Sequence, residues 1–343
     1  MILPSTATLK DVAARAGVSL KTASRVLNEH PSVAPETRAA VLAAIDALRY
    51  TPDQAARSLR AGVDRCVGVL VDSIGDVFFA ELAAAVERRL DEHGYTCLVV
   101  SSNRDRDREV AVAQSFVARR CAGMIVAPLD ENSLATAALR GTPVVFVDRP
   151  GGVAGAVSVV VDDVALSRRA TEHLIDHGHS RIALLSDTPA MGTTRLRHEG
   201  YRQAMAARGL PVDEELVCSD VPQAADVPPA VTRMLALADP PTAIISTNSR
   251  LSLGLIPVLH QFRRTDIAVI SYGDFQLAGS LSPAITVIDH SAAAIGEAAV
   301  AALLPLMRGG TPPAGGVLHV PCRLIPRGSG ELSPVSSTSI GES

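Results

Sequence analysis

The sequence predicts an N-terminal all-α headpiece followed by an α/β core that contains two parallel-sheet lobes. In residues 8–48, apolar side chains recur at helical spacing. From Arg65 onward, short and nearly continuous apolar strands alternate with amphipathic helices, which is typical of parallel sheets buried on both faces. The composition agrees, because 47% of the 343 residues are hydrophobic but only 3% are aromatic, with abundant Ala and Val. This length suits two or three domains.

The first helical stretch, residues 8–28, has the layout of two helices joined by a tight turn. Thr8 is the expected N-cap of the first helix, and Asp11 follows three residues later, close to a capping box. Gly17 can adopt a positive φ after the helix end, and Ser19 is the expected N-cap of the second helix. The turn is then about three residues long, as a helix-turn-helix requires.

The second helix is predicted to read DNA. It should bury Ala23, Val26 and Leu27 and expose a polar and basic face. Leu20 and Lys21 lie in its first turn, where such helices meet base edges, and Arg25 lies one turn later. The small hydroxyl and amide side chains suit phosphate oxygens. The predicted contacts here are Ser19, Leu20, Lys21, Thr22, Ser24, Arg25 and Asn28.

Two ordinary surface helices with solvated polar faces are the alternative to a DNA reader. Four features occur together and argue against this alternative: the helical spacing, the N-cap, the small Ala13 where the two helices must approach, and the basic outward face. A third helix should begin at Pro35 and run to about Leu48, before Pro52.

Residues 8–60 resemble the headpiece of the LacI family of bacterial transcription regulators, which includes the lactose and galactose repressors. Beyond the two helices, the likeness continues through residues 32–38 and 50–52 and ends in residues 55–60. The segment 53–60 has two helical turns at most, too few for a helix that is stable alone. The resemblance implies a hinge over residues 50–62 that is disordered off DNA and folds when two copies pair on an operator.

The resemblance also assigns roles within this hinge. Leu59 matches the leucine that wedges into the minor groove and kinks the duplex, and Ala56 matches the small residue that allows close approach. Arg57 could reach a phosphate. A plain Ala-rich linker is the alternative for this segment.

Charge separates the two predicted parts of the chain. Residues 1–62 hold eight Lys and Arg against five Asp and Glu, although the whole chain has a net charge of −4. A basic small domain on an acidic large one fits a protein that binds a polyanion at one end only.

The core contains two sets of strands. The first set is predicted at residues 66–72, 96–101, 123–128 and 143–148, with a helix at 79–94. The second set is predicted at 182–186, 242–246 and 267–272, with helices at about 167–177, 195–208 and 250–262. Two such lobes enclose a cleft, where ligands of α/β sheets bind at the carboxyl ends of strands.

The core resembles the periplasmic-binding-protein fold that the same regulators use to sense effectors. This resemblance gives a headpiece (1–49), a hinge (50–62) and a core (63–328). Lobe 1 would span about 63–161 and 291–320, and lobe 2 about 162–290 and 321–328. Residues 329–343 are rich in Ser, Gly and Pro, and we expect a disordered tail there. Without leucine heptads in the tail, we expect a homodimer and not a coiled-coil tetramer.

The resemblance places an effector in the cleft, with Arg197 as the arginine that grips it; a surface helix arginine is the alternative. The predicted effector-binding residues are Phe78, Asn103, Asp148, Arg197, Asn248, Arg250 and Asp274. Two departures from the family pattern matter: Gly273 replaces an Asp that often binds sugar hydroxyls, and Arg250 follows Asn248-Ser249 where Asn-Asp is common. We therefore expect an acidic effector, a sugar acid or a sugar phosphate, neutralised by Arg197 and Arg250.

Other classes of protein fit the sequence poorly. There is no GxGxxG after the first strand, no P-loop and no GxSxG, so no enzyme or cofactor site is predicted. His173 and His177 lack the Glu of a zinc-protease motif, and the five cysteines contain no CxxC, which favours buried thiols and no metal. No apolar run or signal-peptide core indicates a membrane or secreted protein, so we expect a cytoplasmic location, on the nucleoid when DNA is bound.

The sequence thus predicts a regulator, most simply a repressor, whose dimer binds a near-palindromic operator in double-stranded DNA under effector control. A ligand-binding transport protein without a role on DNA is the alternative. It would account for residues 63–328 but predicts a signal sequence and no headpiece.

Overall fold

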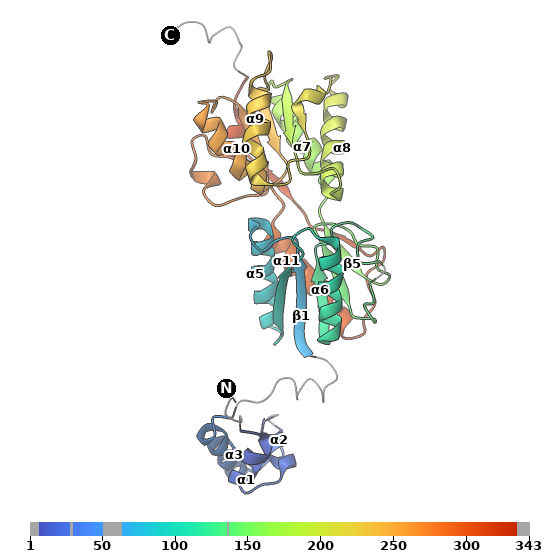
Figure 1. Cartoon of the computed structure of the whole chain (residues 1–343), viewed down its shortest axis with the longest axis vertical. Coiled ribbons are helices and arrows are strands. Elements are labelled where there is room, and N and C mark those ends of the chain that lie inside the picture. Colours follow the sequence, from blue (N-terminus) through green and yellow to red (C-terminus); the bar gives the residue numbers. More distant parts are fainter. Residues whose placement is uncertain (1–6, 28–29, 51–63, 136, 335–343) are drawn as a thin grey trace. The chain divides into compact units, whose positions relative to one another are not determined.

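The computed structural model describes residues 7–27, 30–50, 64–135 and 137–334, and Figure 1 shows their helices and strands. Contacts between Cα atoms divide the chain into two compact units, Met1–Asp64 and Arg65–Ser343. The predicted hinge contacts Ala56, Arg57 and Leu59, as well as Asn28, lie outside the described residues.

The first unit contains three helices, α1 (Leu9–Arg15), α2 (Leu20–Leu27) and α3 (Pro35–Ala47). The expected capping box at the start of α1 is complete, because Thr8 accepts from the Asp11 backbone and donates its own N–H to the Asp11 carboxylate, 2.8 Å away. Gly17 has φ +65° in the turn, and the Ser19 hydroxyl caps α2 by accepting from Thr22 N at 3.1 Å. The core consists of Val12, Ala13, Ala23, Val26, Val41 and Ala44.

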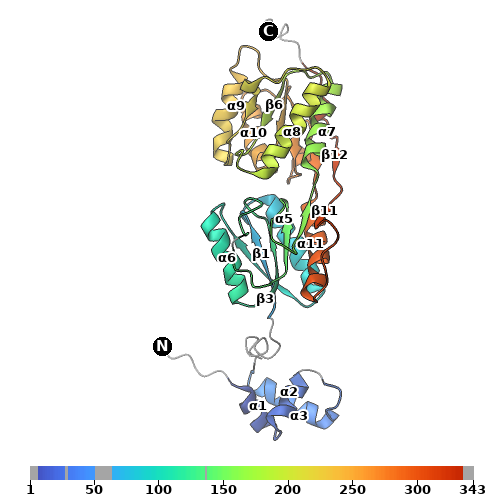
Figure 2. The ribbon, with the colours of Figure 1, turned by 90° about the vertical axis from the view of Figure 1, so that its right-hand side faces the viewer.

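Lobe 1 of the second unit contains a six-stranded sheet in the order β11-β5-β4-β3-β1-β2. Its strands are β1 (Asp64–Val71), β2 (Thr96–Ser101), β3 (Cys121–Val126), β4 (Val144–Val147), β5 (Val157–Val160) and β11 (Val317–His319). One face packs on α5 (Val77–Asp91) and α11 (Ala292–Met307), and the other on α6 (Arg106–Ala118), as Figure 2 shows. Adjacent residues of β1 divide between these faces, Val69 in the α5 core and Leu70 in the α6 core, as strand alternation requires.

Lobe 2 repeats this plan with the order β12-β10-β9-β8-β6-β7. Its strands are β6 (Ile182–Leu185), β7 (Val217–Cys218), β8 (Ala243–Ser246), β9 (Ala268–Tyr272), β10 (Thr286–Asp289) and β12 (Arg323–Ile325). Helices α7 (Asp163–Asp176) and α8 (Gly192–Ala207) pack on one face, and α9 (Val227–Leu235) and α10 (Ser249–Gln261) on the other. Strand β12 runs antiparallel to β10, whereas the pairings β10–β9, β9–β8, β8–β6 and β6–β7 are parallel.

The chain passes between the lobes at three places. It leaves lobe 1 after β5, returns between β10 and α11, and passes to lobe 2 again between β11 and β12. Each lobe is therefore assembled from segments that are distant in sequence. The parallel arrangement brings the carboxyl ends of the central strands to one edge of each sheet.

The prediction that a disordered tail begins at residue 329 is wrong for Ser329–Glu331, which form a 3-10 turn against lobe 2. The Ser329 hydroxyl donates to the Val269 carbonyl at 2.6 Å, and the side chain is buried. A Cβ on Gly330 would lie 2.9 Å from Thr286 Cβ, so a glycine allows the close approach. Composition predicted a disordered tail here, but hydrogen bonds to the sheet hold these small residues in place.

No helix in the described part of the chain is long and apolar enough to cross a membrane. Among the same residues, no group of His, Cys, Asp and Glu is arranged to hold a metal ion.

Of the five cysteines, Cys121 is buried and the others are only partly so, which corrects the prediction of buried thiols.

Candidate functional site

The outward face of α2 presents the side chains that were predicted to meet DNA. Leu20 is 40% exposed, and Ser19, Lys21 and Arg25 are exposed beside it. Ala23 and Val26, by contrast, are buried in the headpiece core. The remaining two predicted contacts, Thr22 and Ser24, are partly buried. Leu20 and Lys21 lie in the first turn of α2, and Arg25 lies in its last turn. An exposed apolar side chain and two cations on one helix can contact base edges and phosphates together.

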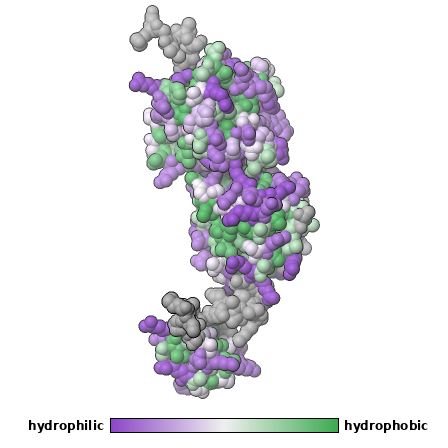
Figure 3. All heavy atoms as spheres, viewed as in Figure 1, coloured by the Kyte–Doolittle hydropathy of each residue, from purple (hydrophilic) through white to green (hydrophobic). Residues whose placement is uncertain are grey.

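A second site lies between the two lobes of the core. A pocket there is lined by residues that follow the strands of both lobes, and we call it the interlobe pocket. An adjoining pocket shares several of its residues, including Asp72, Arg104 and Arg250. Figure 3 shows hydrophilic side chains gathered at the level where the lobes meet.

Helix N-termini also face the interlobe pocket. Asp76 caps α5 by accepting from Phe78 N at 3.0 Å, and Asn248 caps α10 by accepting from Leu251 N at 2.9 Å. The amide ends of helices carry partial positive charge and favour anions. The Asn248 oxygen is therefore already used as a cap, which leaves its amide N–H₂ as the group that could meet a ligand.

Arg197 projects from α8 and is buried in lobe 2. Its Nε donates to the Asp163 carboxylate at 2.7 Å and its Nη1 to the Thr247 carbonyl at 2.5 Å. Its guanidinium carbon lies 4.3 Å from the centre of the Tyr272 ring, within cation–π range. Burial raises the pKa of Asp163 to about 6, although the charge of Arg197 opposes that shift. The surface-arginine alternative for Arg197 is thus wrong.

In lobe 1, Arg149 binds two carboxylates that follow strands. Its Nη2 lies 2.9 Å from Asp72, which follows β1, and its Nε lies 3.0 Å from the neighbouring Asp148. Arg149 and Asp72 are each 3% exposed. One Asp72 oxygen, Oδ1, is buried without a hydrogen-bond partner among the described residues, so it is an available acceptor.

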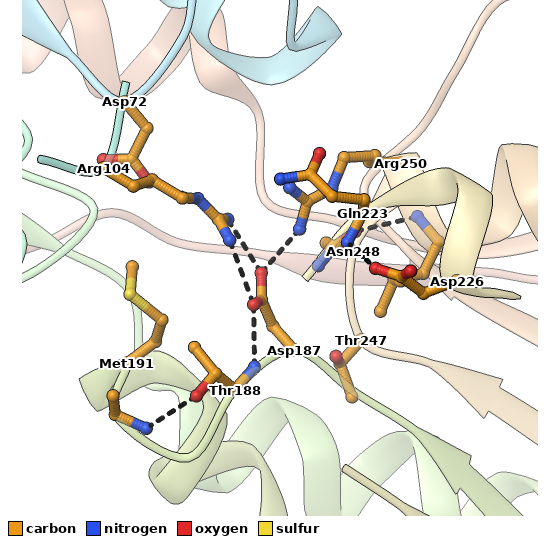
Figure 4. Close-up of polar contacts among 12 residues, drawn as sticks. Asp72, Arg104, Asp187, Thr188, Met191, Gln223, Asp226, Thr247, Asn248 and Arg250 are labelled. Atoms are coloured by element: carbon orange, nitrogen blue, oxygen red, sulfur yellow. Dashed lines mark hydrogen bonds and ion pairs between the residues drawn. The ribbon is translucent and has the colours of Figure 1, made fainter. Parts of the chain in front are cut away.

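A third ion-pair cluster joins the lobes. The carboxylate of Asp187, which follows β6, receives Nη1 and Nη2 of Arg104 at 3.1 and 2.8 Å. Arg250, in the first turn of α10, donates to the same carboxylate at 2.5 Å, and Figure 4 shows the two arginines approaching Asp187 from different sides. Burial alone would raise the pKa of Asp187, but the hydrogen bonds and charge of Arg104 outweigh it and lower the pKa. Within the described ranges, Arg104–Asp187 is the ion pair that links lobe 1 to lobe 2.

Phe78 stacks on His290, at the passage from lobe 2 back to lobe 1, with ring centroids 4.6 Å apart and an interplanar angle of 11°. Burial lowers the pKa of His290 to about 4, and the charge of Arg197 adds to this effect. Gly273 lies against this histidine at φ +81°, and a Cβ there would come within 3.0 Å of His290 Cε1. A side chain at position 273 would therefore be strained by this backbone conformation and crowded by His290.

The structure brings most of the predicted effector-binding residues together. Those in the interlobe pocket are Phe78, Asp148, Arg197, Asn248 and Arg250. Asn103 lines the adjoining pocket instead. Asp274 lines neither pocket, and Arg327 Nη1 binds its carboxylate at 2.8 Å. Its role as an effector contact stays a prediction.

Sequence reasoning missed Asp72, Arg104, Arg149, Asp187 and His290, which also line the interlobe pocket. A signal for two of them was present, because Asp72 and Asp187 are the first charged residues after their strands. In parallel sheets such positions point to the ligand edge. The pairing among these residues could not be predicted, because it depends on how two lobes are placed.

Comparison with known proteins places the chain in a family. Residues 8–53 match the description "Bacterial regulatory proteins, lacI family", and residues 171–330 match a periplasmic binding protein-like domain. The chain is 32% identical, over 87% of its length and 91% of the relative's, to the HTH-type transcriptional repressor PurR of Photobacterium profundum. It is 30% identical to the ribose operon repressor of Escherichia coli K12, with 87% and 92% of the two chains covered. The chain belongs to the lacI family.

Solved structures of lacI-family proteins agree with this assignment. The crystal structure of the Lac repressor dimer bound to operator and the anti-inducer ONPF matches with a TM-score of 0.86 at 27% identity, covering 96% of this chain and 100% of that one. The membership confirms the predicted helix-turn-helix headpiece and the periplasmic-binding-protein-like core. The protein is therefore a DNA-binding transcriptional regulator and not an enzyme.

Proposed function

We propose that this lacI-family protein is a repressor whose homodimer binds a near-palindromic operator under the control of a small effector. The observation that carries this proposal is the α2 face, with exposed Leu20, Lys21 and Arg25 on a helix whose other side is packed into the headpiece core. Several relatives are named repressors, and the Lac repressor structure is a dimer bound to operator. We place the protein in the cytoplasm, where its DNA is.

In this proposal α2 enters the major groove. Leu20 and Lys21 meet base edges, and Arg25 reaches bases or phosphates one turn later. Ser19, Thr22, Ser24 and Asn28 bind phosphate oxygens and fix the register. From the sequence resemblance, Ala56, Arg57 and Leu59 form the minor-groove contact at the operator centre, with Leu59 as the wedge.

The interlobe pocket is the proposed effector site, with Phe78, Asp148, Arg197, Asn248 and Arg250 in it and Asn103 in the adjoining pocket. Charged and aromatic groups from both lobes surround it, so a bound ligand would contact the two lobes at once. An effector that binds one lobe arrangement more tightly shifts the protein toward that arrangement and changes its affinity for DNA.

We propose an acidic effector, a sugar acid or a sugar phosphate. Four arginines line the interlobe pocket, and the N-termini of α5 and α10 face it. Arg197, however, is already held by Asp163 and Thr247, so its part is to shape the pocket floor and offer its remaining N–H groups. Arg250 has a buried Nε without a partner among the described residues, which makes it the better donor to a ligand.

Selection of bound duplexes from a random DNA pool tests the repressor proposal. Wild type and Leu59→Ala are selected in parallel at one fixed salt concentration, because affinity for DNA depends steeply on salt. We expect enrichment of a near-palindrome with a defined centre, bound more weakly by Leu59→Ala. Failure to enrich any sequence, without ligands and with a panel of sugar acids and sugar phosphates, would refute the proposal.

A further inference from the structure

We infer that Arg104 and Arg250 form an acid-binding subsite, that the Asp187 carboxylate occupies it in the ligand-free protein, and that the acidic group of the effector takes its place. The inference deepens the proposed function, because it names the group that the effector must carry and the contact that it must break.

The geometry around Asp187 is that of a bound acid. Arg104 presents two N–H groups to the two carboxylate oxygens at 3.1 and 2.8 Å, which is a bidentate fork. Arg250 donates to Oδ2, and the Thr188 backbone N–H donates to Oδ1 at 2.7 Å. Such a set of donors would receive a ligand carboxylate or a phosphate equally well.

The charges of the pocket show why an acid and Asp187 exclude each other. Among the other arginines of the pocket, Arg149 is paired with Asp72 and Asp148, and Arg197 with Asp163. Arg104 has a second carboxylate, Asp72, at 3.7 Å, but Arg149 holds the same oxygen at 2.9 Å. If Asp187 moved away, Arg104 and Arg250 would therefore be left as cations in a partly buried site, which is costly unless another anion enters.

Two buried polar atoms of the pocket indicate what else the ligand should carry. Asp72 Oδ1 is a buried acceptor without a partner, and Arg250 Nε is a buried donor without one, among the described residues. An acid that also carries a hydroxyl would donate to Asp72 and accept from Arg250. A neutral polyol could satisfy Asp72 but would leave Asp187 in place.

The exchange would act on the link between the lobes. Arg104 follows β2 of lobe 1 and Asp187 follows β6 of lobe 2, so their ion pair ties the two sheets together. An acid that displaces Asp187 breaks this ion pair, and the ligand then connects the two lobes in its place. The effector would thereby change the lobe arrangement that the ligand-free protein prefers.

Isothermal titration of the full-length protein tests the inference, with inorganic phosphate and D-gluconate as acidic probes and D-glucitol as the neutral probe. The variants are Asp187→Asn, which keeps the shape and removes the charge, and the double variant Asp187→Asn with Arg104→Gln. Asp213→Asn is the matched control, because this lobe 2 carboxylate pairs with Arg181 outside both pockets.

We expect Asp187→Asn to bind phosphate or gluconate at least about tenfold more tightly than wild type, because it loses the internal competitor. The double variant should lose that gain, Asp213→Asn should bind like wild type, and glucitol binding should not change in any variant. Tighter binding of phosphate alone would indicate a phosphorylated effector, and of gluconate alone a carboxylate.

The inference is overturned if Asp187→Asn binds neither acid more tightly than wild type, or if Arg104→Gln leaves the gain intact. Circular dichroism of each variant confirms folding. Binding of the selected operator by the wild type and each variant is measured in parallel. If the wild type does not bind DNA, the proposed function is refuted, whereas the acid-binding result still stands.

Discussion

At the scale of single residues, helix α8 of the core carries both a buried ion pair and an exposed one. On α8, the side chain of Arg197 is 7% exposed and pairs with Asp163, whereas that of Arg202 is 45% exposed and pairs with Glu214. Removing one member of a buried pair leaves the other as an uncompensated charge, but exposed pairs contribute little.

We expect Arg197→Ala to lower the free energy of unfolding of the core by about 3 kcal/mol at pH 7.5, because Asp163 would lose its charge partner. Arg202→Ala, the matched control, should change it by less than about 0.5 kcal/mol. Urea denaturation followed by circular dichroism measures both. Equal losses in the two variants would contradict the account.

Burial of His290 predicts a dependence of stability on pH. Its pKa falls from 6.5 to about 4 in the folded protein, so between these values the unfolded chain binds the proton and the folded one does not. Its contribution to stability is therefore present above pH 6.5 and is lost as pH falls toward 4. Asp163, whose pKa rises to about 6, contributes in the opposite direction, because its contribution is lost as pH rises through 6.

We expect wild type to lose about 2 kcal/mol more stability than His290→Gln between pH 7 and pH 5, because the variant has no imidazole to protonate on unfolding. Comparing the two proteins cancels the contributions of Asp163 and the other acids. Urea denaturation at both pH values gives the difference. Identical pH dependence in the two proteins would show that His290 titrates normally.

At the scale of elements, the packing of α7 on α8 depends on the absence of a side chain at Gly200. A Cβ there would lie 2.2 Å from the Val164 carbonyl oxygen and 2.9 Å from Arg168 N, both backbone atoms of α7 that cannot rotate away. The two helices would have to separate, and their cluster with β6 would loosen.

Gly200→Ala should lower the free energy of unfolding of the core by about 3 kcal/mol, although alanine favours helix more than glycine does. Gly279→Ala is the control, because no atom lies within 4 Å of a Cβ at that position. Thermal unfolding by circular dichroism compares them. A neutral or stabilising Gly200→Ala would contradict the close approach.

The sequence patterns predicted elements well where burial alone determines them. The strand predicted at residues 96–101 coincides with β2, and those predicted at 182–186 and 267–272 overlap β6 and β9 closely, because each is a short apolar run between turns. Helix α11 was not predicted, since its Ala-rich sequence, AAAIGEAAVAALLPLM, has no clear polar face. Helix α7 begins at Asp163, before the predicted 167, because Asp162 caps it by accepting from Ala165 N.

At the scale of the whole molecule, the two units differ in how they present their charged side chains. The headpiece presents cations on α2, and the core keeps its arginines paired with carboxylates around a pocket between its lobes. The candidate contacts on α2 could be predicted because they depend on one helix and its spacing. The ion pairs of the interlobe pocket could not, because Arg104 and Asp187 are 83 residues apart and meet only when both lobes are built.

The central claim, that α2 reads operator bases, is tested most directly by repeating the DNA selection with Lys21→Ala. Arg15→Ala is the matched control, because it removes an equal charge from an exposed residue of α1. We expect Lys21→Ala to lose or change the preferred base at one symmetric position in each half-site, and Arg15→Ala to enrich the wild-type sequence. Enrichment of the unchanged wild-type sequence by Lys21→Ala would contradict the claim.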